Sequence, residues 1–157
     1  MERKPTLGLR RGAWLGLAMA SIAATGLSSK ASLAADMPNA CPVDGCTVEI
    51  VAAKRAGNEI QLTLKANFAP DMSKNHIHVW WGENYTIKQV SNNAEPVYKV
   101  KQGEWHPMAD YPVYVTQSAA STKVRGNAKT LCVSPADRNH DILDVKIFNC
   151  MDVSSAL

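Results

Sequence analysis

The residues best suited to chemistry lie in one short run, residues 72–81, which reads Met-Ser-Lys-Asn-His-Ile-His-Val-Trp-Trp. In a β-strand, successive side chains point to opposite faces, so His76, His78 and Trp80 would share one face. Imidazoles two residues apart on a strand lie ~7 Å apart, a separation that one metal ion can bridge. Neutral imidazole is a common protein ligand for copper and zinc. The spacing therefore predicts a face that binds a metal or another ligand.

Three further donors extend the metal site predicted from the sequence: His106, Met72 and Met108. Thioether sulfur favours Cu(I), so a mixture of histidine and methionine is typical of a copper-handling site. The predicted ligand set is thus His76, His78, His106, Met72 and Met108, with copper or zinc as the metal. The triplet 76–78 resembles the copper ligands of copper–zinc superoxide dismutases over three residues, and the other ligands and glycines of that family are not matched.

Aromatic side chains give the same face a second use. Trp80 and Trp105 offer large flat surfaces on which a sugar, a peptide or a small organic ligand could pack. The predicted ligand-binding residues are therefore His76, His78, Trp80 and Trp105. The fourth histidine, His140, lies in the polar segment 137–141, which spaces its polar side chains like the start of a calcium loop but lacks the glycine and glutamate that such a loop needs.

Motifs typical of enzymes are missing from the sequence. It contains no Gly-x-Ser-x-Gly, no glycine-rich phosphate loop and no His-Glu-x-x-His. The leading functional hypothesis is a non-catalytic binding or interaction domain for an unknown small molecule or protein. The alternatives are a protein that binds or handles copper or zinc through its His-x-His strand, and a small exported enzyme.

The N-terminal 35 residues have the pattern of a removable signal peptide. A net positive start precedes fifteen uncharged residues, 13–27, and small and polar residues follow. That apolar run is shorter than the ~20 residues that a membrane-spanning helix needs. We expect cleavage near residue 35, export to the bacterial periplasm or the exterior by either the general or the twin-arginine route, and no stable membrane span afterwards.

The charge balance of residues 36–157 argues against nucleic acid as a partner. Five of the 17 Lys and Arg residues and one of the 14 Asp and Glu residues lie in residues 1–35, which leaves 12 basic and 13 acidic groups and a net charge of −1. Binding to a phosphate backbone requires a basic surplus. No such surplus remains.

Residues 36–157 also contain all four cysteines, and their number of residues, 122, suits one domain. An even cysteine count in an exported chain indicates two disulfides. Of the three possible pairings, proximity in sequence favours Cys41–Cys46 and Cys132–Cys150. A zinc–thiolate site is the alternative, but the spacings match no familiar zinc pattern.

Alternating polar and apolar residues predict a mostly β domain. The clearest alternation covers residues 60–68, and a turn at 55–58 should join it to a strand at 48–52 in a hairpin. Further strands are expected at 75–81, 97–101, 111–117, 130–133 and 142–148. Pro112 restricts its strand to a sheet edge or to a strand start. A helical turn is expected at 134–137. Frequent short strands predict an Ig-like antiparallel β-sandwich, with a small β-barrel as the alternative.

Overall fold

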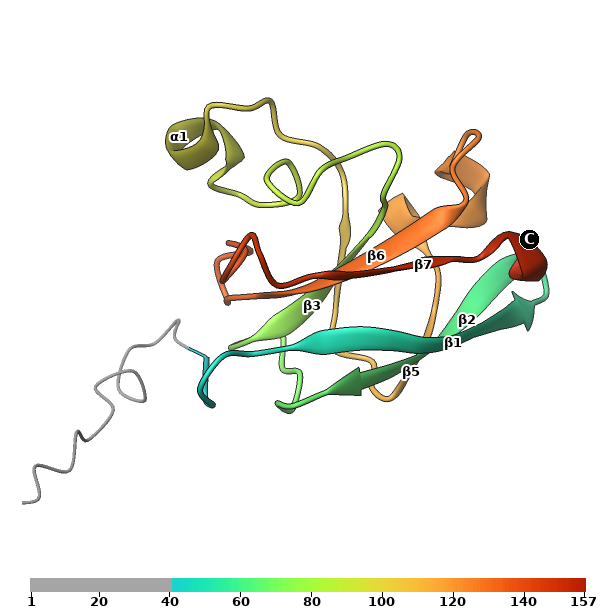
Figure 1. The fold of residues 1–157 in the computed structure, drawn as a ribbon, viewed down its shortest axis with the longest axis horizontal. Helices are drawn as coiled ribbons and strands as arrows, with labels where there is room; N and C mark the ends of the chain where they lie inside the picture. Colours follow the sequence, from blue (N-terminus) through green and yellow to red (C-terminus); the bar gives the residue numbers. More distant parts are fainter. Residues whose placement is uncertain (1–40) are drawn as a thin grey trace, which may run out of the picture. The chain divides into compact units, whose positions relative to one another are not determined.

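A computed structural model describes residues 41–157, and the predicted signal peptide, residues 1–35, lies outside this part of the chain. Two antiparallel sheets make up the domain, with strand orders β1-β2-β5 and β4-β3-β6-β7 (Figure 1). The strands are β1 (Val48–Ala56), β2 (Glu59–Ala66), β3 (His76–Trp81), β4 (His106–Met108), β5 (Val113–Val115), β6 (Thr130–Ala136) and β7 (Asn149–Asp152). The helical elements are α1 (Ala94–Tyr98) and three 3₁₀ turns, η2 (Ser118–Ala120), η3 (Thr122–Val124) and η4 (Ser154–Ala156).

The predicted hairpin is the pair β1 and β2, which are antiparallel neighbours along their full length. Gly57 supplies the turn with φ +65°, a conformation that glycine adopts without steric cost. Alternate residues of β2 (Ile60, Leu62 and Leu64) are buried, as the period-2 pattern predicts. β5 pairs only with β2 and forms an edge, with Pro112 directly before it.

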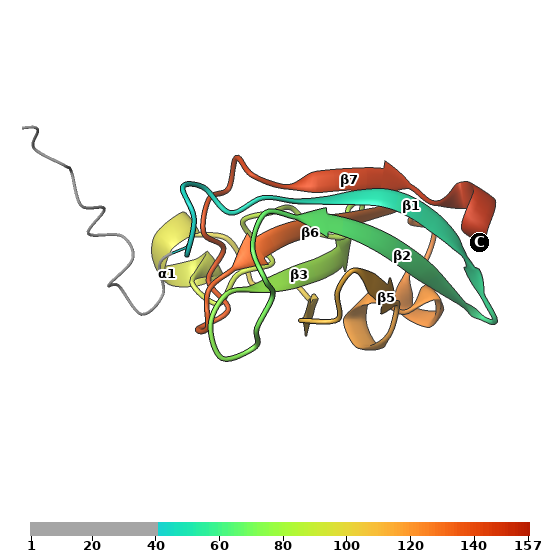
Figure 2. The same cartoon turned by 90° about the horizontal axis from the view of Figure 1, so that it is seen from below.

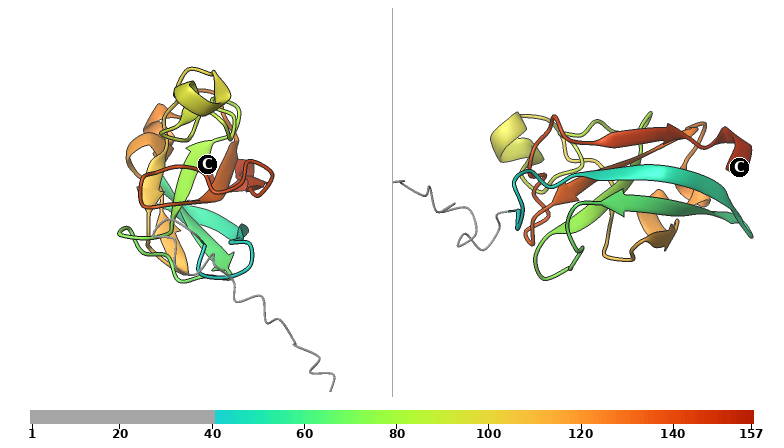
Figure 3. Two further views of the ribbon diagram at one scale, coloured as in Figure 1. Left: turned by 90° about the vertical axis from the view of Figure 1, so that its left-hand side faces the viewer. Right: turned by 60° about the horizontal axis from the view of Figure 1, so that its bottom comes forward.

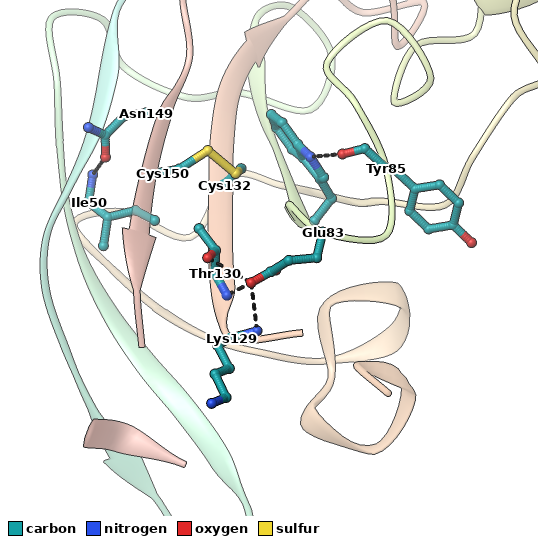
Figure 4. The surroundings of a disulfide bond; sticks show 9 residues. Ile50, Glu83, Tyr85, Lys129, Thr130, Cys132, Asn149 and Cys150 are labelled. Carbon is teal, nitrogen blue, oxygen red and sulfur yellow. Dashed lines mark hydrogen bonds between the residues drawn. A yellow bond between two sulfur atoms is a disulfide. The ribbon is translucent and has the colours of Figure 1, made fainter. Parts of the chain in front are cut away.

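The second sheet is built around β3, which pairs with β4 on one side and β6 on the other. β7 pairs with β6, and the Cys132–Cys150 disulfide joins two residues that lie directly opposite each other (Figure 4). A second disulfide, Cys41–Cys46, closes the loop before β1. Both predicted disulfides are confirmed.

One hydrophobic core lies between the two sheets. It combines buried side chains from both, such as Leu62 of β2 and Ile77 and Val79 of β3. β1 lies beside β7, where the Ile50 N–H donates to the side-chain oxygen of Asn149 (Figures 1 and 4). The strands of residues 41–157 thus form two stacked sheets and not one closed barrel, which confirms the sandwich prediction.

The outer face of the second sheet is covered as well. Residues from 82–105 and 137–148 pack there in a smaller apolar cluster that includes Trp80, Val90 and Ile142. Figures 2 and 3 show α1, which lies within residues 82–105, at the opposite end of the sheets from the C-terminus. As a result, all six residues of β3 are buried. The apolar face of β3 was predicted correctly, and the opposite face, which carries the histidines, is buried as well.

Three local predictions are also wrong. Residues 97–101 are not a strand, because the chain forms α1 and then turns at Lys99 with φ 58°. Residues 134–137 are not a helical turn, because β6 continues to Ala136 beside β3; Pro135 is tolerated since the pairing with β7 ends at Val133. Residues 142–148 make one isolated bridge, and the last strand starts at Asn149.

Within residues 41–157, no helix has both the length and the hydrophobicity needed to cross a membrane.

Candidate metal centre

Three histidines meet on the outer face of the second sheet. His76 and His78 come from β3 and are fully buried, and His140 approaches from the loop before Ile142. Nε2 of His76 lies 3.2 Å from Nε2 of His78 and 2.9 Å from Nδ1 of His140. The ligand atoms of all three lie within 4.8 Å of one another. We call these residues the histidine cluster.

The backbone alternation of β3 explains why two of these side chains converge. Residues 76 and 78 point to the same face, and their rings tilt toward each other with centroids 5.1 Å apart. The ~7 Å spacing expected for an untwisted pair is therefore reduced, at the ring nitrogens, to hydrogen-bonding distance.

A tight polar loop holds His140 in place. The buried carboxylate of Asp137 accepts hydrogen bonds from the backbone N–H groups of Asn139, at 2.8 Å, and Asp141, at 3.0 Å. The N–H of His140 donates to the carbonyl of Asp137, and the carbonyl of His140 accepts from the N–H of Asn92. His140 itself has φ 64°, an uncommon backbone conformation for a residue other than glycine. Such backbone conformations occur often at functional sites.

His78 has a defined tautomer. Its Nδ1 lies 2.8 Å from the carbonyl oxygen of Val90, which can only accept a hydrogen bond. Nδ1 must therefore carry the hydrogen, and in the neutral ring Nε2 keeps a lone pair directed at the cluster. Histidines that bind metals are usually oriented by this kind of hydrogen bond on the other ring nitrogen.

The three converging nitrogens have too few protons to satisfy one another. With Nε2 of His78 unprotonated, a proton on Nε2 of His76 or on Nδ1 of His140 can fill one of the two contacts, but protons on both would clash. Every neutral arrangement free of that clash supplies at most one hydrogen for the two contacts. A cation at this position would accept all three lone pairs.

The other nitrogen of His76 is left without a partner. Nδ1 is buried and makes no hydrogen bond. If Nε2 binds a metal, the hydrogen of the neutral ring moves to Nδ1. A small rotation of the ring would then be needed to bring this N–H to an acceptor.

Burial keeps His76 and His78 neutral. Burial, and then the proximity of His140, lower the pKa of His76 to about 4, despite the opposing influence of Asp137. Burial also holds the pKa of His78 well below its ordinary value of 6.5. Both rings are therefore unprotonated at neutral pH, which is the form that binds metals.

The distances suit a small transition ion. Nitrogens bound at ~2.0–2.1 Å to a tetrahedral metal are ~3.3 Å apart. The observed contacts of 3.2 Å and 2.9 Å are close to this value, so small ring movements would admit the ion. Three nitrogen ligands suit zinc or copper.

A cavity of about 340 Å³ adjoins the histidine cluster, lined by His140 together with residues 102–105, Pro107 and Ala119. Trp105 stacks on the ring of His78 with centroids 5.0 Å apart. Pro107 is the strand partner of His78 in β4, so both point to the same face of the sheet.

The other residues predicted from the sequence lie elsewhere. His106 and Met108 pair with Val79 and Ile77, so they point into the core, on the opposite side of the sheet from the histidine cluster. His106 instead stacks on Tyr114 with centroids 5.7 Å apart. Met72 is exposed and lines a separate hollow beside Phe68. The structure does not bring these three donors to His76 and His78.

The two tryptophans predicted to bind a ligand, Trp80 and Trp105, lie in different environments. Trp80 is buried at 1% exposure, where its indole N–H donates to the carbonyl of Tyr85. Trp105 is half-buried against the cavity. These two side chains therefore do not form an exposed aromatic patch.

His140 is the member of the histidine cluster that the predicted ligand set omits. It is 62 residues after His78 in the sequence, and no local spacing connects the two. The available signal was the segment 137–141, in which a histidine is surrounded by turn-forming Asp and Asn residues.

Comparison with models of protein families, with curated proteins and with solved structures finds no match to this chain.

Proposed function

We propose that this protein is a metal-binding domain in which Nε2 of His76, Nε2 of His78 and Nδ1 of His140 hold one copper or zinc ion. The observation that carries the proposal is the convergence of three imidazole nitrogens with too few hydrogens to fill the contacts between them. Buried polar atoms in folded proteins nearly always have partners. A metal ion supplies the partner for all three at once.

The ligand set favours Zn²⁺ or Cu²⁺ over Cu(I) handling through thioethers. Imidazole binds both divalent ions, and the usual order of affinities places Cu²⁺ above Zn²⁺. The methionines that would favour Cu(I) lie in the core or on the surface, away from the histidine cluster.

The two disulfides support a place for the working protein in an oxidising compartment, the periplasm or the cell exterior. The signal pattern of residues 1–35 agrees with export, and we propose that the metal is bound after export.

A competition titration tests this function. The chain without residues 1–35 is purified, stripped with a chelator and titrated with Zn²⁺ or Cu²⁺ in the presence of a chromogenic chelator of known affinity. We expect one high-affinity ion per chain. Removing only a hydrogen-bond partner of a metal ligand costs up to ~100-fold in affinity. Because His140→Gln removes a ligand itself, the affinity should fall by at least ~100-fold.

The matched control is His106→Gln, because His106 is a half-buried histidine outside the histidine cluster. It should bind the metal as the wild type does. Equal losses in both variants, or no high-affinity binding in the wild type, would contradict the proposal.

A further inference from the structure

The histidine cluster supplies three donors where a tetrahedral ion takes four. Among the His, Cys, Asp and Glu residues of the described part of the chain, only these three form a group able to hold a metal ion. Structural zinc sites fill all four positions with protein ligands, whereas sites that act on other molecules leave one position open. With three protein ligands, the histidine cluster matches the sites that leave one position open.

The cavity beside the histidine cluster touches it through two of the ligands. His140 lines the cavity directly. His78 is covered on one side by Trp105 and flanked in the sheet by Pro107, and both of these residues also line the cavity. A molecule in the cavity therefore lies beside the ring of His140 and against the tryptophan that covers His78.

The chemistry of the cavity walls limits what would fit. Trp105, Pro107 and Ala119 make its surface mostly apolar, and its charged side chain, Glu104, is exposed at the rim. The volume of about 340 Å³ is within the ~300–1,000 Å³ typical of small-molecule sites. An indole favours a flat partner, because aromatic rings attract each other in offset or edge-on packing.

We infer that the cavity opens onto the fourth coordination position of the metal and receives a small ligand with one metal-binding donor on a flat, apolar body, such as a substituted nitrogen heterocycle. This inference rests on the proposed metal-binding function. The donor atom would complete the coordination sphere, and the apolar body would pack against Trp105, Pro107 and Ala119.

The test uses cobalt, because Co²⁺ occupies zinc sites and its visible absorption reports its coordination. Co²⁺-loaded protein is titrated with 4-phenylimidazole and, separately, with imidazole. We expect a saturable change in the visible spectrum with both, and an affinity for 4-phenylimidazole at least ~10-fold higher, equivalent to ~1.4 kcal/mol from packing of the phenyl ring.

The variant Ala119→Phe places a larger side chain in the cavity and leaves all three histidines unchanged. It should bind Co²⁺ as tightly as the wild type and lose at least ~10-fold in affinity for 4-phenylimidazole while retaining binding of the smaller imidazole. The comparison of the two probes on the wild type remains informative if this variant does not fold.

Several results would overturn the inference while leaving the metal site intact. One such result is a Co²⁺ spectrum that neither probe alters, and another is equal affinity for the two probes. A third is release of Co²⁺ from the protein on addition of the probe, which would mean that the probe competes with the histidines. Failure of the protein to bind Co²⁺ at all would instead contradict the proposed function.

Discussion

Acid should destabilise the metal-free protein strongly, and the histidine cluster determines the pH range. The unfolded chain takes up a proton on each histidine near the ordinary pKa of 6.5, whereas the folded chain resists protonation of His76 until about pH 4. Between these values the unfolded state binds more protons, so the free energy of unfolding falls as the pH falls. The full stability is present above pH 6.5 and declines as the pH falls toward 4.

The size of the effect follows from the shift of His76. At pH 5 a pKa difference between 6.5 and about 4 corresponds to a loss of ~2 kcal/mol relative to pH 7.5. His78 and His106, whose pKa values are also lowered by burial, contribute with the same sign. For a domain of this size, ~2 kcal/mol lowers the melting temperature by roughly 8 °C.

The assay is denaturant unfolding at pH 7.5 and pH 5 in the presence of a chelator. We expect the wild type to lose at least ~2 kcal/mol between the two conditions and His76→Gln to lose ~2 kcal/mol less than the wild type, because glutamine does not titrate. Carboxylates with lowered pKa values respond only at more acidic pH, so they contribute little above pH 5. Equal stability at the two pH values, or a pH dependence unchanged in His76→Gln, would refute the reasoning.

Two further predictions concern residues that position the cluster and the sheet. Asp137→Ala removes the acceptor for the N–H groups of Asn139 and Asp141. All three histidines remain, and we expect the metal affinity measured by competition to fall ~10–100-fold. Unchanged affinity would show that the loop holds His140 without this carboxylate. Gly82→Ala would place a Cβ 2.7 Å from Sγ of Cys132, which the disulfide holds in place, so we expect ~1–3 kcal/mol of destabilisation by denaturant unfolding, and no loss would mean that the disulfide shifts freely.

Much of the sandwich could be predicted because its signals are local. The alternation of residues 60–68 specifies the buried face of β2, and the same period-2 rule places Ile77 and His78 on opposite faces of β3. Sequence proximity was enough to pair the cysteines. These features depend on the geometry of single strands and short loops.

Features that depend on tertiary contacts could not be predicted in this way. Residues 97–101 alternate like a strand, but they form the end of α1 and the turn after it, where no neighbouring strand pairs with them. His106 was predicted as a further ligand, and only the register of β4 against β3 shows that it points into the core. His140 reaches the cluster through a loop whose position depends on Asp137 and Asn92.

X-ray absorption spectroscopy of the zinc- or copper-loaded protein tests the central claim most directly, because it counts the imidazoles bound to the metal. We expect three imidazole nitrogens at ~2.0–2.1 Å in the wild type and in His106→Gln, and two in His140→Gln. A wild-type spectrum with one imidazole or none, or with sulfur in the coordination sphere, would contradict the assignment of the ion to His76, His78 and His140.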